Sequence, residues 1–223
     1  GQKFVNIDSF NKKMESLEFS SETNEIKEFN FDELSTISSP NNSIQINKKF
    51  IVNKIKSGLI IINQERAHQR ILYEKFLKSV TLNNINSQKL LHPIEIEFSK
   101  VDIQILSSKK DILNQFGLDF DLEQDKIIIK AIPSFIDSED LSESFNNLIY
   151  NVQNDVPDES FSESDFISKI ISKSMSIKNG KSLKLNEQQY IINSLFACKE
   201  TMICPFNKRT FVKIDFSEIE NMF

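Results

Sequence analysis

The sharpest change of hydrophobic pattern along the chain falls between residues 57 and 80. An aliphatic run at 58–62 predicts a strand that is buried on both faces rather than wetted on one. From Gln64 onward the apolar residues recur at helical spacing, with Leu72, Phe76 and Val80 four apart and basic residues on the other side. The pattern therefore predicts a strand that runs almost directly into a helix over 64–80.

The same reading of period and turn residues assigns the rest of the chain. Ile94, Ile96 and Phe98 alternate with glutamates, which is typical of a strand with one buried face. Ser99 and Asp102 resemble a helix cap, and a helix is expected from there to residue 116. Further strands are expected at 46–54, 118–122, 126–132 and 210–216, and further helices at 138–152, 166–178, 186–198 and from 217 onward.

These elements predict an α+β fold in two subdomains. One subdomain, built on a mixed sheet, takes residues 46–80 and 161–223, and its helix 64–80 bridges to the other. The other is an inserted β-α-β-β-α unit over 88–155, followed by a hinge at 153–159. Residues 1–45 are acidic and rich in turn residues, so we expect a poorly ordered lead-in.

Composition narrows the function classes. The chain has 223 residues, of which 39% are hydrophobic, so it can bury a core. Its net charge of −5 disfavours an autonomous DNA-binding domain. Four glycines leave no Gly-rich nucleotide loop, and there is neither a signal peptide nor a run of eighteen apolar residues. With only two cysteines, a soluble, reducing, cytoplasmic setting without membrane contact is the simplest expectation.

Residues 63–74, NQERAHQRILYE, resemble the strand-to-helix motif of the C-terminal domain of MutL mismatch-repair proteins. Nuclease-competent members of that family carry Asp-Gln-His-Ala-x-x-Glu and, after four more residues, a second Glu. Here Gln64 and Glu74 match, whereas Asn63, Glu65 and Gln69 replace the Asp, the His and the first Glu. The resemblance implies that the scaffold is kept while most of the metal ligands are not.

Two other elements of the family's metal site depart in the same direction. Ser172-Lys173-Ser174 stands where nuclease-competent relatives have Ala-Cys-Arg/Lys, and Phe206 replaces the His of a Cys-Pro-His element in which Cys204 and Pro205 match. Amides, an ammonium group and a phenyl ring are poor ligands for a catalytic divalent metal. We therefore expect no cofactor and no enzymatic activity, with Cys198 and Cys204 as two small buried thiols.

An alternative stays open beside this interpretation. A rewired metal site could use Glu65, Glu74, His68 and Cys204, and the chain would then be a metal-dependent DNA-nicking endonuclease domain. Glu65 shares a helix face with His68 or Gln69 in the expected helix. Surface-polar roles for these side chains are the competing interpretation.

The resemblance implies that the chain is a homodimerisation and interaction domain of a mismatch-repair protein. In the family, a variable linker joins this domain to an N-terminal ATPase, and the insert corresponding to 88–155 is regulatory. Residues of the aliphatic strand are the candidates for the dimer interface, since that strand has two faces to cover: Leu59, Ile60, Ile61 and Ile62. The implied partners are a second copy and other mismatch-repair proteins, with DNA bound only weakly or through the N-terminal region.

One short segment indicates a further partner. Gln88, Leu91 and Pro93 fit a Gln-x-x-Leu/Ile-x-Pro pattern that binds the replication sliding clamp in some bacterial members of the family. Such an extended peptide places its Gln amide and its apolar side chain in separate pockets of a partner. The competing interpretation is that Leu90 and Leu91 simply enter the core ahead of a strand.

Overall fold

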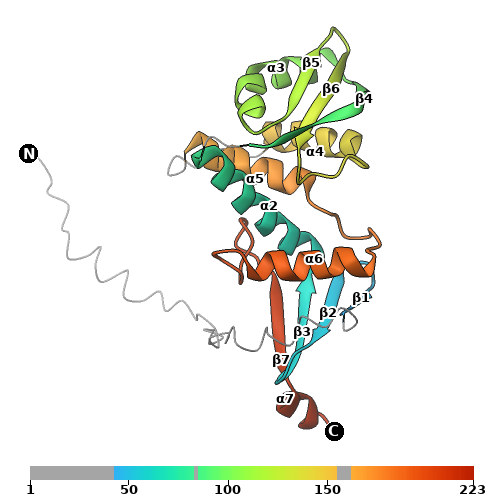
Figure 1. Cartoon of the computed structure of the whole chain (residues 1–223), viewed down its shortest axis with the longest axis vertical. Coiled ribbons are helices and arrows are strands. Elements are labelled where there is room, and N and C mark those ends of the chain that lie inside the picture. The colour runs from blue at the N-terminus through green and yellow to red at the C-terminus, as the bar shows by residue number, and fades with distance from the viewer. Residues whose placement is uncertain (1–42, 83–84, 155–161) are drawn as a thin grey trace, which may run out of the picture. The chain divides into compact units, whose positions relative to one another are not determined.

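The computed structural model describes residues 43–82, 85–154 and 162–223 (Figure 1). The expected lead-in over residues 1–42 and the hinge residues 155–159 lie outside them. The strands are β1 (Ser43–Ile46), β2 (Phe50–Lys54), β3 (Gly58–Asn63), β4 (Ser87–Glu97), β5 (Asp119–Leu122), β6 (Lys126–Pro133) and β7 (Phe211–Asp215). The helices are α2 (Gln64–Thr81), α3 (Lys100–Gln115), α4 (Leu141–Asn154), α5 (Glu163–Met175), α6 (Leu185–Phe196) and α7 (Phe216–Glu220). These elements confirm the predicted α+β class.

The first sheet has four strands in the order β1-β2-β3-β7, and every pair in it is antiparallel. The predictions of a mixed sheet and of a single strand over 46–54 were wrong. The chain turns between β1 and β2, where Asn47 and Lys48 have positive φ values of 52° and 47°, so one expected strand becomes a hairpin. Residues 43–45, assigned above to the lead-in, belong to this sheet.

Strand β3 lies in the interior of that sheet, between β2 and β7. Ile60 and Ile62 are fully buried, but Leu59 and Ile61, which point to the opposite face, are only half-buried. The expectation of a strand buried on both faces was therefore wrong for this chain. Gly58 is required where β3 meets β7, because a Cβ atom there would lie 2.0 Å from the carbonyl oxygen of Ile214.

Helix α2 follows β3 without a loop, as the sequence predicts. Asn63 caps its first turn, since the side-chain oxygen accepts a hydrogen bond from the backbone N–H of Arg66 at 3.0 Å. The far half of the helix contributes Leu72 and Phe76 to the main hydrophobic core. Figure 1 shows α2 passing from the four-stranded sheet toward the elements of the second sheet.

The second sheet is antiparallel in the order β4-β6-β5. Its inner face packs Ile96, Phe120, Ile127 and Ile129 into the main core, together with residues of α3, α4 and α5. Ser99 accepts from the backbone N–H of Asp102, which confirms the expected cap of α3. The expected hairpin between β5 and β6 is confirmed as well.

Three of the expected helices, α4, α5 and α6, have different limits in the structure. Helix α4 runs over Leu141–Asn154 and not over 138–152, so it begins three residues later than predicted. Helix α5 begins at Glu163 and ends at Met175, three residues earlier at each end than predicted. Its cap is Ser162, whose side chain accepts from the backbone N–H of Asp165. Helix α6 runs over Leu185–Phe196 and packs on α2 and β1. None of the helices in the part of the chain described here combines the length and apolarity needed to cross a bilayer.

Candidate functional site

The outer face of the four-stranded sheet is apolar almost throughout. Strand alternation and register place one set of side chains on the face opposite Ile60 and Ile62. The apolar members of that set, called the open face below, are Ile44, Ile46, Phe50, Val52, Leu59, Ile61, Val212 and Ile214, and its polar members are Lys54 and Asn63 at strand ends. Ile44, Ile46 and Val212 are 67%, 50% and 40% exposed, and the other five are half-buried.

The register aligns four of these side chains in one row across the sheet. Ile44 pairs with Val52, Val52 with Ile61, and Ile61 with Val212. β-Branched side chains in directly opposed positions pack closely on one another and form a flat apolar surface. A continuous exposed apolar surface of this kind indicates a site for a partner.

The four interface candidates divide between the two faces of β3. Leu59 and Ile61 lie on the open face, where a partner could reach them. Ile60 and Ile62 have no exposed surface and point to the opposite face. Strand β3 therefore supplies two of the four candidates to the open face, and β1, β2 and β7 supply the rest of that surface. The sequence signal for the others was the alternation in SIQI and FVKID.

The first positions of the metal motif are engaged in holding the chain together. Asn63 caps α2 and is 7% exposed. Glu65 accepts a hydrogen bond from the Asn179 amide at 2.7 Å and lies 4.0 Å from the ammonium group of Lys178. Gln69, also 7% exposed, donates to Glu65 at 3.5 Å. The motif glutamate at position 65 is thus held by amides and an ammonium group.

Glu74, the last position of the motif, binds the backbone of the segment that follows α6. Its carboxylate accepts from the backbone N–H groups of Lys199 and Glu200 at 2.8 and 3.1 Å, and it pairs with Arg70 at 3.7 Å. These bonds fix the segment after α6 to α2. Glu74 therefore has a structural role. Arg70 has one as well, because it donates to the carbonyl of Ile203 at 2.7 Å.

Two replaced positions from distant parts of the sequence contact each other. The ammonium group of Lys173 lies 5.3 Å from the centre of the Phe206 ring, which is a cation–π contact. The hydroxyls of Ser172 and Ser174 instead bond to carbonyls of their own helix. Sequence comparison showed the two replacements separately, but only the fold shows that they pack together.

The residues of the alternative metal site are not brought together. Within the described ranges no three His, Cys, Asp or Glu side chains are close enough to hold a metal ion. His68 uses Nδ1 to accept from the backbone N–H of Ile177 at 2.9 Å. Burial, with smaller effects from Lys75, Lys178 and Lys181, lowers the pKa of His68 to about 3. At the family's own ligand positions, Asn63, Gln69, Lys173 and Phe206 supply two amides, an ammonium group and a phenyl ring. These groups do not fit the divalent metal that the resemblance implies.

The two cysteines differ from one another in exposure. Cys204 is buried, as expected, and begins the turn that leads to Arg209. Cys198 is only half-buried, so the expectation of two buried thiols was wrong for this residue, and its thiol donates to the carbonyl of Ser194 at 3.3 Å. Burial, together with the nearby Glu74 carboxylate, raises the pKa of the Cys198 thiol to about 12. The environment of Cys198 therefore disfavours the thiolate that a metal needs as a ligand.

The candidate clamp-binding segment forms the first half of β4, at the edge of the second sheet. Its pairing with β6 is interrupted between Lys89 and Ile94, so the segment bulges from the sheet. Leu90 packs partly against the core, as the competing interpretation expected, but Leu91 is 90% exposed, so that interpretation was wrong for Leu91. The exposed Gln88 and Pro93 flank it.

The fold and the open face define a class: an α+β interaction domain with one apolar sheet surface. Residues 43–183 match the family described as "MutL C terminal dimerisation domain", and the chain belongs to this family. It is 38% identical to the DNA mismatch repair protein MutL of Flavobacterium psychrophilum over 99% of this chain and 36% of that protein. The MutL proteins of Flavobacterium johnsoniae (38%; 99% of this chain, 34% of that protein) and Chlorobium chlorochromatii (28%; 80% and 28%) are also similar. The chain thus spans about a third of the length of these relatives.

Proposed function

We propose that this domain joins two copies of a mismatch-repair protein through the open face of its four-stranded sheet. The family is a dimerisation family, and its curated relatives are mismatch-repair proteins. The observation that supports the surface is the row Ile44, Val52, Ile61 and Val212, apolar across all four strands. Fully burying an exposed Val, Leu, Ile or Phe side chain is worth about 1.5–3 kcal/mol. Ile44, Ile46 and Val212 are the most exposed of the eight positions, so they contribute the largest share of the driving force for a pair.

A charge in the centre of the row tests this surface. Ile61→Lys places an ammonium group between Val52 and Val212, and a desolvated, unpaired charge opposes association strongly. We expect the dissociation constant of the dimer to rise by about a hundredfold or more. Sedimentation velocity over a range of protein concentrations measures it.

Ile128→Lys is the matched control, because Ile128 is also a half-buried isoleucine on an interior strand. It lies opposite Glu95 and Asp121 on the outer face of the second sheet, where a lysine is tolerated. We expect this variant to dimerise like the unmodified chain. A monomeric unmodified chain at micromolar concentration, or equal loss of dimer in both variants, would reject the proposed surface.

We further propose that the domain does not cut DNA. The support is chemical: Glu65 is engaged by Asn179 and Lys178, and Lys173 occupies a ligand position with a positive charge. Incubation with supercoiled plasmid and Mn²⁺ should give no nicked product above a protein-free control. Nicking that is abolished by Glu65→Ala would instead favour the rewired endonuclease.

A second proposed partner is the replication sliding clamp, bound through Gln88, Leu91 and Pro93. The support is the 90% exposure of Leu91 on an irregular edge strand, which leaves the side chain and adjacent backbone available for a partner. Gln88→Ala and Leu91→Ala should each weaken clamp binding by about tenfold in surface plasmon resonance. Leu82→Ala, which alters another exposed leucine outside the segment, should bind normally. Unchanged binding in the first two variants would remove the clamp from the proposal.

The division of labour within the domain follows from these surfaces. We assign dimerisation to residues 46–80 and 161–223, extended to Ser43 by strand β1, and regulation to the inserted residues 88–155. A cytoplasmic location and contacts with other mismatch-repair proteins complete the proposal. DNA would be bound weakly or by the N-terminal region that the longer relatives contain.

A further inference from the structure

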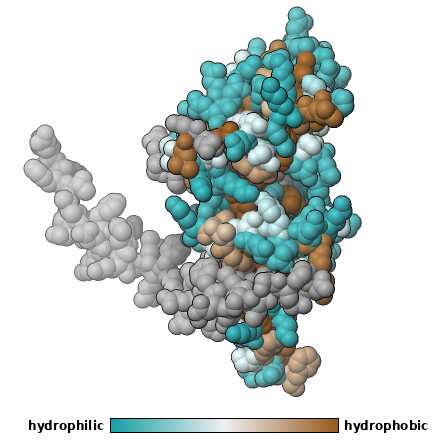
Figure 2. All heavy atoms as spheres, in the orientation of Figure 1, coloured by the Kyte–Doolittle hydropathy of each residue, from teal (hydrophilic) through white to brown (hydrophobic). Residues whose placement is uncertain are grey.

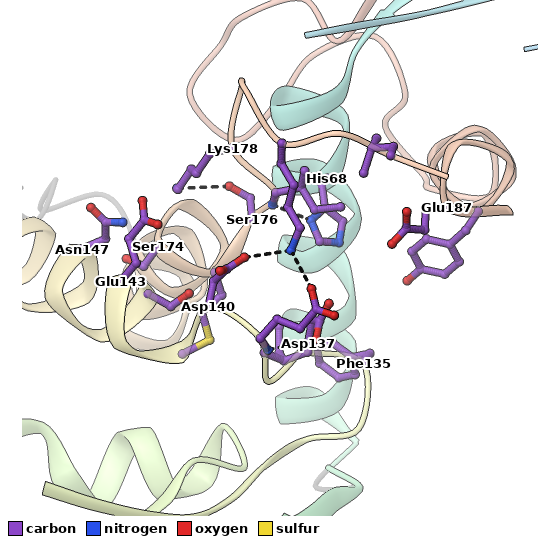
Figure 3. A pocket seen from close by; sticks show the side chains of 18 of the residues that line it. His68, Phe135, Asp137, Asp140, Glu143, Asn147, Ser174, Ser176, Lys178 and Glu187 are labelled. Carbon is purple, nitrogen blue, oxygen red and sulfur yellow. Dashed lines mark hydrogen bonds and ion pairs between the residues drawn. The ribbon is translucent and has the colours of Figure 1, made fainter. Parts of the chain in front are cut away.

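A cleft of about 940 Å³ opens beside α2 (Figure 3), and its lining includes none of the open-face residues. One wall is the segment from Ser134 to Asn147, which leads from β6 into α4. The other wall is made by the end of α5, the loop after it and the start of α6. His68 of α2 lies between the two walls.

Carboxylates outnumber ammonium groups around this cleft. Five acidic residues line it: Asp137, Glu139, Asp140, Glu143 and Glu187. Lys181 pairs with Glu139 at 3.4 Å and with Asp140 at 2.8 Å, so it offsets part of this charge. Asp137, Glu143 and Glu187 form no ion pair with another described residue, which leaves negative charge facing the cleft from both walls.

The cleft also contains two aromatic rings that already hold an ammonium group. The Nζ atom of Lys75 lies 5.4 Å from the centre of the Phe135 ring and 5.1 Å from that of Tyr190. It also donates a hydrogen bond to the Tyr190 hydroxyl at 2.6 Å. Aromatic faces beside carboxylates are a recurrent solution for binding organic cations, and here the chain's own lysine shows that the geometry accepts one.

Within the described part of the chain, an unpaired donor faces the cleft from helix α2. Because His68 Nδ1 accepts from Ile177, a neutral ring carries its proton on Nε2. The side chain is 8% exposed, and its ring faces the cleft in Figure 3, with no partner for Nε2 among the described residues. An N–H group that is open to the cleft can donate to a carbonyl oxygen, and a peptide backbone supplies one.

We propose that this cleft binds a basic peptide segment of a protein partner. Lysine or arginine side chains of the segment meet Asp137, Glu143 and Glu187, and a backbone carbonyl accepts from His68 Nε2. An acidic segment fits less well, because all three described lysines of the cleft are already engaged. Lys181 is paired with carboxylates, Lys178 is held by Glu65 and by backbone and hydroxyl oxygens, and Lys75 is held by the Phe135 and Tyr190 rings. Since the two walls come from different parts of the fold, an occupant would also hold them together.

Fluorescence anisotropy with a fluorescein-labelled peptide of four Arg-Gly repeats tests the proposal on the whole chain. The triple variant Asp137→Asn, Glu143→Gln, Glu187→Gln removes three charges but keeps side-chain oxygens for the caps at Glu139 and Lys184. We expect at least a fivefold rise in the peptide dissociation constant. His68→Phe, which removes the N–H donor, should weaken binding by a smaller factor.

The control triple variant is Glu97→Gln, Asp111→Asn, Glu220→Gln, which changes the net charge equally at exposed positions outside the cleft. We expect its affinity to stay within twofold of the unmodified chain. Equal weakening in both triple variants would show non-specific attraction to an acidic protein and overturn the proposal. So would tighter binding of a Glu-Gly repeat peptide, or no binding of the Arg-Gly peptide at low salt.

Discussion

The two sheets of this domain present opposite chemistries on their outer faces. On the four-stranded sheet the outward positions are apolar, apart from Lys54 at the end of β2 and Asn63 at the end of β3. On the three-stranded sheet they are mainly charged, and the charges are paired, across strands or with the turn between β5 and β6. Lys126 lies 2.8 Å from Glu95 and 3.5 Å from Glu123, and Lys130 pairs with Asp121.

The difference indicates which outer face can stay exposed to water in a single copy of the chain and which needs a partner. Cross-strand ion pairs let a sheet face water on one side and blunt its tendency to associate. The second sheet has this arrangement around Ile128, its half-buried outward isoleucine. The first sheet lacks it around Ile61, although both isoleucines lie on interior strands. Figure 2 shows brown, apolar atoms at several places on one side of the molecule, so the register is needed to identify the continuous row.

The largest expected effect is a difference in the free energy of unfolding between substitutions on the two faces of β3. Ile60 has no exposed surface, so Ile60→Ala should lower the free energy of unfolding by about 3 kcal/mol, within the usual range for a cavity in a core. Ile61 is half-buried, so Ile61→Ala should cost a monomer less than half as much. Urea unfolding at about 1 μM and about 50 μM protein measures both variants, because dimerisation makes stability depend on concentration.

The two variants should differ in how their loss of stability depends on protein concentration. The deficit of Ile60→Ala should be similar at the two protein concentrations, whereas that of Ile61→Ala should grow at the higher one as its dimer is lost. If the deficit of Ile61→Ala were the same at both concentrations, the open face would not contribute to association.

The sequence predicted the elements far better than it predicted the faces. Period and capping residues placed α2 and α3 within a residue or two, because local interactions determine these helices. The turn at Asn47 and Lys48 escaped detection, since neither glycine nor proline marks it, and β1 was missed with it. Without β1 and β7 paired to β2 and β3, the row across the sheet could not be seen.

The metal positions show a similar limit. The family resemblance identified the positions of the metal ligands, and the residue identities indicated that Asn63, Gln69, Lys173 and Phe206 are poor ligands. What compensates for the lost ligands depends on contacts between distant segments, such as Glu65 with Asn179 and Lys173 with Phe206. No periodicity encodes such contacts, so only the fold could reveal them.

A second, smaller effect concerns α2, the helix that connects the two sheets. The folded state holds His68 with a pKa of about 3, below its ordinary value of 6.5, so the unfolded state binds the proton first as pH falls. Stability should therefore be full above pH 6.5 and should drop by about 2 kcal/mol between pH 7 and pH 5. His68→Gln should flatten this part of the profile, whereas His92→Gln, at the chain's other and exposed histidine, should not. An unchanged slope in His68→Gln would contradict the assignment.

The smallest effect should come from the charged face of the second sheet. Lys130→Met removes the partner of Asp121 at an exposed site, and exposed ion pairs contribute little because water and salt screen them. We expect the melting temperature to fall by no more than about 2 °C, with the difference vanishing near 1 M NaCl. Calorimetry measures the temperature, and sedimentation velocity tests the second consequence: exposing more of Ile128 beside a new apolar side chain should promote association. If the variant keeps the oligomeric state of the unmodified chain, the Lys130–Asp121 pair alone does not prevent association through the outer face of the second sheet. The contrast between the two sheets would then depend on all the charged side chains of that face together.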